Sequence, residues 1–133
     1  MAKKKLQIVP IGGLGEVGKN MMVFEYGNNI MIIDTGIMFP ENDMLGIDFI
    51  IPDFGYLNDK WHMVRGIVIT HGHEDHTGAI AYVLENCIDV PIYATALTRG
   101  LLEVKLRNAR LVNDAKLNTV KAGDRVNIGP FEV

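Results

Sequence analysis

The chain has 133 residues, a length that corresponds to a single domain over residues 1–133. Hydrophobic residues make up 48% of the sequence and charged residues 22%, which is ordinary for a globular protein and excludes a disordered or low-complexity chain. The net charge of −3 gives no sign of a broad basic surface, so an RNA substrate must be supported by other features.

The beginning of the chain lacks the pattern of a targeting or membrane segment, so we expect none there. Pro10, Gly12 and Gly13 interrupt the apolar run that a signal peptide would need. No apolar stretch approaches the roughly 20 residues of a membrane-spanning helix. We therefore expect a cytoplasmic protein with no membrane partner. The three lysines at 3–5 are interpreted as a loose end of the chain rather than as an RNA-binding arm.

The chain has one cysteine, Cys87, so no intrachain disulfide can form. A zinc site built from several cysteines is excluded for the same reason. Because Cys87 continues an apolar helical pattern, we expect it to be a small residue of the hydrophobic core.

The first half of the sequence predicts three strands followed by a long loop. Residues 6–11 form a short apolar run, which is typical of a strand. Residues 21–25 and 30–34 are two further strand-like runs. The turn-forming residues 27–29 between them predict a hairpin. Residues 36–60 are irregular, and a connection this long inside a compact domain usually covers a functional site.

The second half of the sequence alternates strands and helices. The predicted elements are a strand at 66–70, a helix at 77–86, a strand at 90–94, a helix at 97–111, and a hairpin of residues 117–120 with 125–128. Strands followed by strand–helix alternation predict an α/β fold with a mixed sheet and flanking helices. Residues 131–133 resemble the start of another strand, so we expect the chain to be the amino-terminal part of a longer protein.

Three of the four histidines lie between residues 71 and 76, between a predicted strand and a predicted helix. In an extended segment, residues two apart point to the same side, so His71 and His73 can bind one metal ion together. Asp75 and His76 come at the bend into the helix and can serve a second ion. Imidazole and carboxylate ligands suit zinc, and also manganese or iron. The sequence therefore predicts a site for two divalent metal ions.

Two metal ions about 3.5–4 Å apart can share a water molecule, lower its pKa and bind a phosphoryl or carbonyl oxygen. The nucleophile would then be the metal-bound hydroxide, and no side chain need attack the substrate. Glu74 points away from its neighbours in an extended segment, so we do not expect it to bind metal. His62 is isolated beside Trp61 and is interpreted as a surface or packing residue.

The order His71-x-His73-x-Asp75-His76 resembles the metal-binding motif of the metallo-β-lactamase superfamily. This resemblance implies an αββα sandwich with metal ions at one edge of its sheets, of which this chain would form an incomplete, amino-terminal part. Asp34 ends a predicted strand and matches the first motif of the superfamily. We expect Asp34 to orient a metal-binding imidazole through its other ring nitrogen, with a simple turn cap as the alternative. On these motifs alone, the substrate could be a lactam, a thioester, a lactone or a phosphodiester.

The flanking segments are similar to the ribonuclease J family of the β-CASP group. The similar segments, in the order of that family, are residues 12–21, 33–41, 48–53, 70–79 and 97–101. The resemblance implies a cytoplasmic RNA-processing enzyme, active in the processing of ribosomal RNA and in RNA decay, with 5′-to-3′ exonuclease and endonuclease activity. It also implies single-stranded RNA with a 5′-monophosphate as substrate, zinc as the metal with manganese possible, and a homo-oligomer of the full-length protein.

The family's remaining metal ligands, its β-CASP domain and its carboxy-terminal domain have no counterpart in this chain. Four ligands for two ions fall short of the three protein ligands that a catalytic zinc normally has. We therefore expect the chain alone to bind metal weakly and to cut RNA poorly or not at all. Two other interpretations stay open: a hydrolase of a small thioester or lactone, and a truncated domain without catalytic activity.

Overall fold

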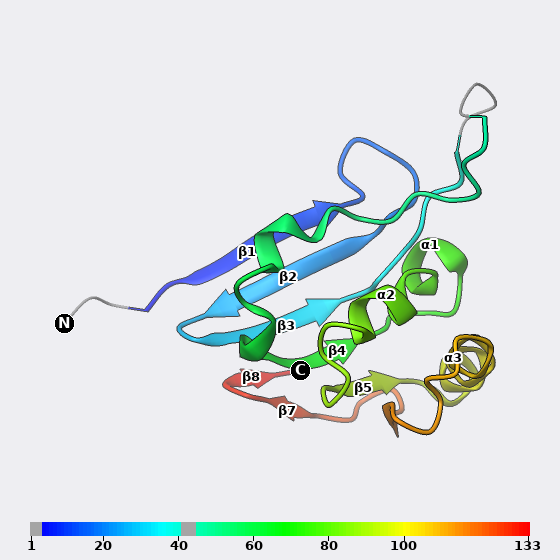
Figure 1. The fold of residues 1–133 in the computed structure, drawn as a ribbon. Helices are drawn as coiled ribbons and strands as arrows, with labels where there is room; N and C mark the ends of the chain where they lie inside the picture. The colour runs from blue at the N-terminus through cyan, green and yellow to red at the C-terminus, as the bar shows by residue number, and fades with distance from the viewer. Residues whose placement is uncertain (1–3, 41–44) are drawn as a thin grey trace.

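The computed structural model describes residues 4–40 and 45–133, which form a six-stranded mixed sheet and a separate two-stranded sheet (Figure 1). In the large sheet the strands lie side by side in chain order. The strands of the large sheet are β1 (Leu6–Gly12), β2 (Met21–Tyr26), β3 (Asn29–Ile33), β4 (Val64–Val68), β5 (Pro91–Ala94) and β6 (Lys116–Thr119). The strands of the small sheet are β7 (Asn127–Ile128) and β8 (Phe131–Glu132). The α-helices are α1 (Glu74–Thr77), α2 (Ile80–Leu84) and α3 (Ala96–Asn108), and the 3-10 helices are η1 (Phe54–Leu57) and η2 (Trp61–Met63).

The antiparallel half of the large sheet consists of β1, β2 and β3. The predicted hairpin is confirmed, since Tyr26 pairs with Asn29 across the turn. Gly27 in this turn has a φ of +61°, which glycine adopts without the steric penalty of a side chain. The strand prediction extended one residue too far, because Asp34 leaves β3 with a φ of +65°.

The other half of the sheet is parallel, from β3 through β4 and β5 to β6. The predicted hairpin of residues 117–120 with 125–128 is wrong. After α3 the chain returns to the sheet, and β6 pairs with the edge of β5. The other predicted arm of the hairpin, which contains β7, pairs with β8 and not with β6. The turn residues that suggested a hairpin, including Gly123 with a φ of +91°, lie in the connection from the large sheet to the small one.

The predicted helix at 77–86 is divided and begins earlier than expected. The structure has α1 at Glu74–Thr77 and α2 at Ile80–Leu84. The break between α1 and α2 is stabilised by a tertiary contact. The Ala79 N–H donates to the Thr35 carbonyl (2.7 Å) instead of to a carbonyl of α1. Apolar spacing located the buried face of α2, but it carried no information about the single turn of α1, which contains Asp75 and His76.

The hydrophobic core lies between the sheet and the helices α2 and α3. Its fully buried members include Ile32, Ile67 and Ile92 from the strands, and Leu84 and Leu102 from the helices. The small sheet covers the opposite face, where Ile128 occupies the space that a side chain at Gly66 would need. The predicted α/β class with a mixed sheet and flanking helices is thus confirmed.

Three further expectations concerned Cys87, the lysines at 3–5 and the long connection at 36–60. Cys87 is a core residue as predicted, and burial raises the pKa of its thiol to about 12. Of the lysines at 3–5, Lys3 falls outside the described residues, whereas Lys4 and Lys5 are exposed. The long connection at 36–60 is irregular apart from η1 and a pair of backbone hydrogen bonds between Met38 and Ile50; its residues 41–44 also fall outside the described part.

Among the described helices, none combines the length and the apolar character that a membrane crossing would require.

Candidate metal centre

The predicted ligand loop follows β4 at the edge of the sheet where the parallel strands end. His71 and His73 lie between β4 and α1, and His73 is the N-cap of α1. Asp75 and His76 are part of α1 itself. Asp34 follows the adjacent strand β3, so the parallel pairing of β3 with β4 brings Asp34 to the same edge. Four predicted ligands and the predicted supporting aspartate therefore share one end of the sheet.

The structure brings three of these ligands into one group. Donor atoms of His71, Asp75 and His76 lie within 4.8 Å of one another. The ring centroids of His71 and His76 are 3.9 Å apart, whereas those of His71 and His73 are 4.9 Å apart. Two imidazoles and a carboxylate form a donor set that fits zinc or manganese. His73 stands beside this group and is not one of its three members.

Asp34 is buried behind the ligand group, with 6% of its surface exposed. Its Oδ2 lies 2.7 Å from Nδ1 of His76, so the other ring nitrogen of His76, Nε2, faces the donor group. Its Oδ1 accepts hydrogen bonds from the backbone N–H (2.8 Å) and the hydroxyl (3.0 Å) of Thr70. Asp34 has a φ of +65°. A positive φ at a residue other than glycine is uncommon and often marks a functional position. Asp34 thus contacts the imidazole of His76 and also accepts from the backbone N–H of Thr70, and its orienting role remains a prediction.

Two neighbouring loops hold the backbone of α1. The N–H groups of Asn20, Thr35 and Ile37 donate to the carbonyls of Asp75 (3.1 Å), His76 (2.8 Å) and Glu74 (3.1 Å), respectively. The carbonyls of Asp75 and His76 belong to a helix of one turn and take their partners from these loops, whereas the Glu74 carbonyl also accepts from the Gly78 N–H at the end of α1. The position of the candidate ligands is consequently fixed by residues more than thirty positions away in the sequence.

Asn20 is a site residue that the sequence did not indicate. Its side-chain Nδ2 lies 3.1 Å from the carbonyl of Asp75, 3.4 Å from Oδ2 of Asp75 and 3.3 Å from Nε2 of His76. The last two are atoms that a metal ion would bind. Asn20 follows a glycine-rich loop whose own turn is closed by the Gly13 N–H donating to Glu16, a bond that lowers the pKa of Glu16. This loop is therefore a local turn.

Helix α3 supports the other side of the ligand loop. Lys105 donates to both carboxylate oxygens of Glu74, at 2.6 and 2.8 Å. The side chain of Leu101 fills the space beside Gly72, where an added Cβ would lie 2.3 Å from its Cδ1. Glu74 is thus paired with a lysine, and it lies in α1 rather than in the extended segment that the sequence suggested.

Two cavities flank the donor group. One, of about 290 Å³, is lined by His73, Asp75 and the exposed apolar side chains of Val17 and Phe39, among others. The other, of about 180 Å³, is lined by residues that include Leu14, Asn20, Asp34 and His76. Both are open spaces next to candidate ligands, where a substrate could approach.

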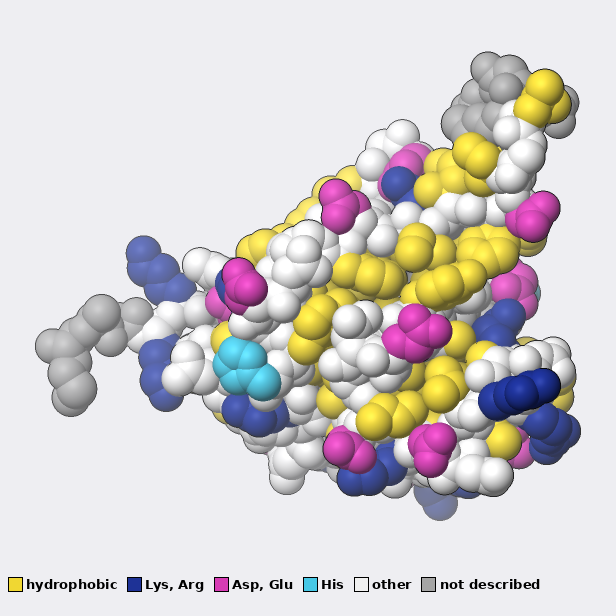
Figure 2. Space-filling view, viewed as in Figure 1, with side chains coloured by type: hydrophobic (Ala, Val, Ile, Leu, Met, Phe, Trp, Pro, Cys, Tyr) yellow, Lys and Arg dark blue, Asp and Glu magenta, His cyan; other side chains and the backbone are white. Residues whose placement is uncertain are grey.

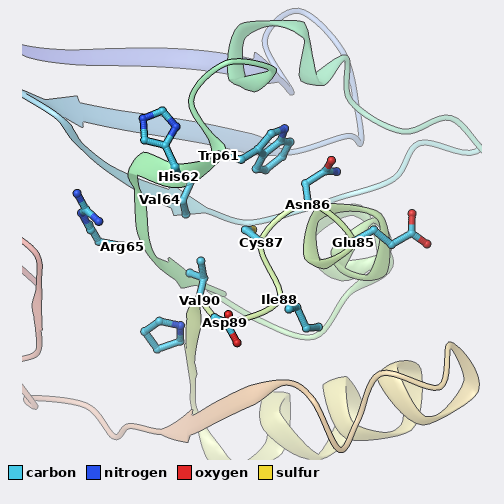
Figure 3. A pocket seen from close by; sticks show the side chains of 11 residues that line it. Trp61, His62, Val64, Arg65, Glu85, Asn86, Cys87, Ile88, Asp89 and Val90 are labelled. Atoms are coloured by element: carbon cyan, nitrogen blue, oxygen red, sulfur yellow. The ribbon is translucent and has the colours of Figure 1, made fainter.

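A larger cavity of about 620 Å³ lies away from the ligand loop, at the end of the sheet where β4 and β5 begin (Figure 3). Its lining combines Trp61 and Val90 with side chains of both charges, among them Arg65 and Asp89. His62 is exposed on its rim, in agreement with its interpretation as a surface residue. None of the candidate metal ligands contributes to this cavity.

Comparison with known proteins gives a family match over most of the chain. Residues 14–125 match the model of the metallo-beta-lactamase superfamily. The chain is 44% identical to a ribonuclease J from Synechocystis sp. over 93% of its own length, and 48% identical to a ribonuclease J 1 from Streptococcus pyogenes serotype M3 over 81% of its length. It spans only 19% of each of these relatives, in their amino-terminal parts.

Solved structures show the same fold at low sequence identity. A protein of unknown function from Enterococcus faecalis V583 has a TM-score of 0.73 at 16% identity, over 98% of this chain and 36% of that one. A B3 metallo-beta-lactamase with an active-site glutamic acid has a TM-score of 0.61 at 18% identity, over 94% of this chain and 47% of that one. The predicted metallo-β-lactamase-like fold is therefore confirmed.

Proposed function

Because the chain belongs to the metallo-beta-lactamase superfamily, we propose that residues 71–76 form the metal centre of a metal-dependent ribonuclease. The observation that carries this proposal is the donor group of His71, Asp75 and His76, which lies at one edge of the sheet in a chain with ribonuclease J relatives. His73 completes the set of proposed ligands, since its ring is adjacent to that of His71.

The proposed cofactors are two divalent ions, zinc or manganese. Bound ions of this kind lower the pKa of a coordinated water and neutralise charge on a phosphoryl oxygen. The residues of the chain supply the donor atoms and hold them in place. Asp34 keeps Nε2 of His76 directed at the group, and the Asn20 amide lies against the same nitrogen. No side chain of the site is proposed to attack the substrate.

The proposed substrate is single-stranded RNA with a 5′-monophosphate, cut by 5′-to-3′ exonuclease and endonuclease activity in the cytoplasm. This part of the proposal is supported by the ribonuclease J relatives and not by surface charge. On the face seen in Figure 2, basic and acidic side chains are interspersed, without a broad basic field. We assign RNA binding to the edge around the metal centre and to further parts of the protein.

We also propose that the active protein is longer than 133 residues and forms a homo-oligomer. The chain spans about a fifth of its curated relatives. Three grouped donors can serve one ion, whereas two catalytic ions would need about three protein ligands each. The additional ligands are assigned to residues outside this chain, so the chain alone should bind metal weakly and cut RNA poorly.

The experiment is a cleavage assay on 5′-monophosphorylated RNA with the full-length natural protein that contains this chain. We expect metal-dependent cleavage that His76→Ala abolishes and that the matched substitution His62→Ala leaves unchanged. Equal cleavage by His76→Ala and wild type would refute the site. Hydrolysis of a small thioester or lactone with no effect on RNA would instead support a small-molecule hydrolase, and inactivity on all three substrates would support a non-catalytic domain.

A further inference from the structure

The hydroxyl of Thr70 lies between Asp34 and His71. Its Oγ1 is 3.0 Å from Oδ1 and 2.8 Å from Oδ2 of Asp34, and 3.0 Å from Nδ1 of His71. Thr70 is the second residue after β4, and its backbone N–H also donates to Asp34 at 2.8 Å. The backbone N–H and the hydroxyl of Thr70 thus both donate to the Asp34 carboxylate, and these hydrogen bonds hold the hydroxyl beside His71.

The chemistry of these groups determines where the protons lie. A carboxylate only accepts hydrogen bonds, and a hydroxyl has one proton to donate. The Thr70 proton is therefore directed at Asp34, which leaves the Thr70 oxygen as an acceptor toward His71. For this contact to be a hydrogen bond, the proton of the neutral imidazole must be on Nδ1.

We infer that Thr70 is a positioning residue that extends the control of Asp34 from His76 to His71. In this arrangement His71 carries its proton on Nδ1 and keeps the lone pair of Nε2 for a metal ion. The inference deepens the proposed function, because it identifies what holds a second candidate ligand in its binding form. The tautomer itself can be measured whether or not the protein cuts RNA.

The Asp34 carboxylate contacts His76 directly and His71 through the Thr70 hydroxyl. His76 contacts Asp34 directly at 2.7 Å, whereas its distance to the Thr70 oxygen is 3.5 Å. His71 has no direct hydrogen bond to Asp34 among the described contacts and reaches it through Thr70. Removing the hydroxyl should therefore release His71 and leave His76 as an internal control. Because Thr70 is exposed, water can replace the hydroxyl, but water both donates and accepts and so does not fix a tautomer.

Thr70→Val and Thr70→Ser form a matched pair of variants. Valine keeps the shape of threonine and the backbone N–H but lacks the hydroxyl, whereas serine keeps the hydroxyl. The measurement is the ¹⁵N chemical shifts of the imidazole nitrogens in the metal-free chain, at a pH at which both histidines are neutral. We expect the proton of His71 to be on Nδ1 in wild type and in Thr70→Ser, and to be shared between Nδ1 and Nε2 in Thr70→Val. His76 should keep its proton on Nδ1 in all three proteins.

A competition titration with a chromogenic zinc chelator is the second measurement. Loss of a group that orients a metal ligand typically weakens metal binding about 10–100-fold, and we expect Thr70→Val to fall at the lower end, near tenfold. Thr70→Ser should bind zinc almost as wild type does. A wild-type His71 with its proton on Nε2 would overturn the inference even if no variant folded, and so would an unchanged tautomer in Thr70→Val. Absence of zinc binding by wild type, with the expected tautomers, would contradict the proposed metal centre and still support the role of Thr70.

Discussion

Asp34→Ala is expected to lower the free energy of unfolding by roughly 2–4 kcal/mol and to abolish the weak metal binding that we expect of the wild-type chain. Asp34 accepts hydrogen bonds from the Thr70 N–H, the Thr70 hydroxyl and His76, and it is 6% exposed. Loss of the hydrogen bonds to this charged carboxylate costs about 1.5–3 kcal/mol. Alanine at a φ of +65° adds strain of about 1 kcal/mol or more. Urea unfolding of the metal-free chain measures the first effect and zinc titration measures the second.

Asp34→Asn separates the two effects. Asparagine tolerates a positive φ, and its amide oxygen can still accept from the Thr70 N–H. Its NH2 group, however, donates where the carboxylate accepted, so it cannot orient His76 with the proton on Nδ1. We expect stability closer to wild type than that of Asp34→Ala, together with zinc binding weakened about 10–100-fold. Zinc affinity equal to wild type in Asp34→Asn would contradict the orienting role.

Gly36→Ala is the second substitution with a large expected effect. A Cβ at residue 36 would lie 1.6 Å from the carbonyl oxygen of Asp75 and 2.8 Å from the backbone nitrogen of Asn20. Both are backbone atoms that are tied into the hydrogen bonds around α1, so neither can move without displacing the ligand loop. We expect a loss of about 3 kcal/mol or more in the free energy of unfolding.

Gly100→Ala provides the matched control for this clash. Gly100 lies within α3, and an added Cβ there meets no atom within 4 Å. Alanine in a helix interior is favoured over glycine, so this variant should be more stable by about 0.5–1 kcal/mol. Chemical denaturation of the two variants measures the contrast. Equal stability of Gly36→Ala and wild type would mean that the loop of Gly36 does not approach the backbone of Asp75.

The candidate ligands could be predicted from the sequence because they lie close together along the chain. His71, His73, Asp75 and His76 lie within six positions, and a strand followed by a helix brings such residues to one edge of a sheet. Asp34 was predicted from its place at the end of a strand and from its match to the first motif of the superfamily. Its exact bonding partners were not, since they depend on the parallel pairing of β3 with β4.

The residues that the sequence did not reveal act across long stretches of chain. Asn20 is 55 positions from Asp75, and Lys105 is 31 positions from Glu74. Neither belongs to a periodic pattern or a motif with a metal-binding spacing, so only the folded chain brings them to the site. Thr70 is adjacent to His71, but it was counted as part of the preceding strand. The structure ends β4 at Val68 and thereby places the Thr70 hydroxyl in the loop.

The wrong hairpin prediction has a similar cause. Residues 122–124 have the composition of a tight turn, and Gly123 does adopt the positive φ of one. Turn chemistry specifies a change of direction but not which strands pair on either side. The pairing of β6 with β5 was decided by the return of the chain through α3 to the open edge of the parallel sheet.

Calorimetric titration of zinc into the metal-free chain tests the metal centre most directly, with His76→Ala and His62→Ala as the two variants. His76 belongs to the donor group, and its loss should weaken binding by more than the roughly 10–100-fold expected of a supporting residue. His62 is exposed on the rim of the distant cavity, and its replacement should leave binding unchanged. We predict weak binding of a single ion by wild type and by His62→Ala, and almost none by His76→Ala. Equal binding by His76→Ala and wild type would contradict the assigned ligands, and two tight sites on the wild-type chain would contradict the proposal that further ligands lie outside it.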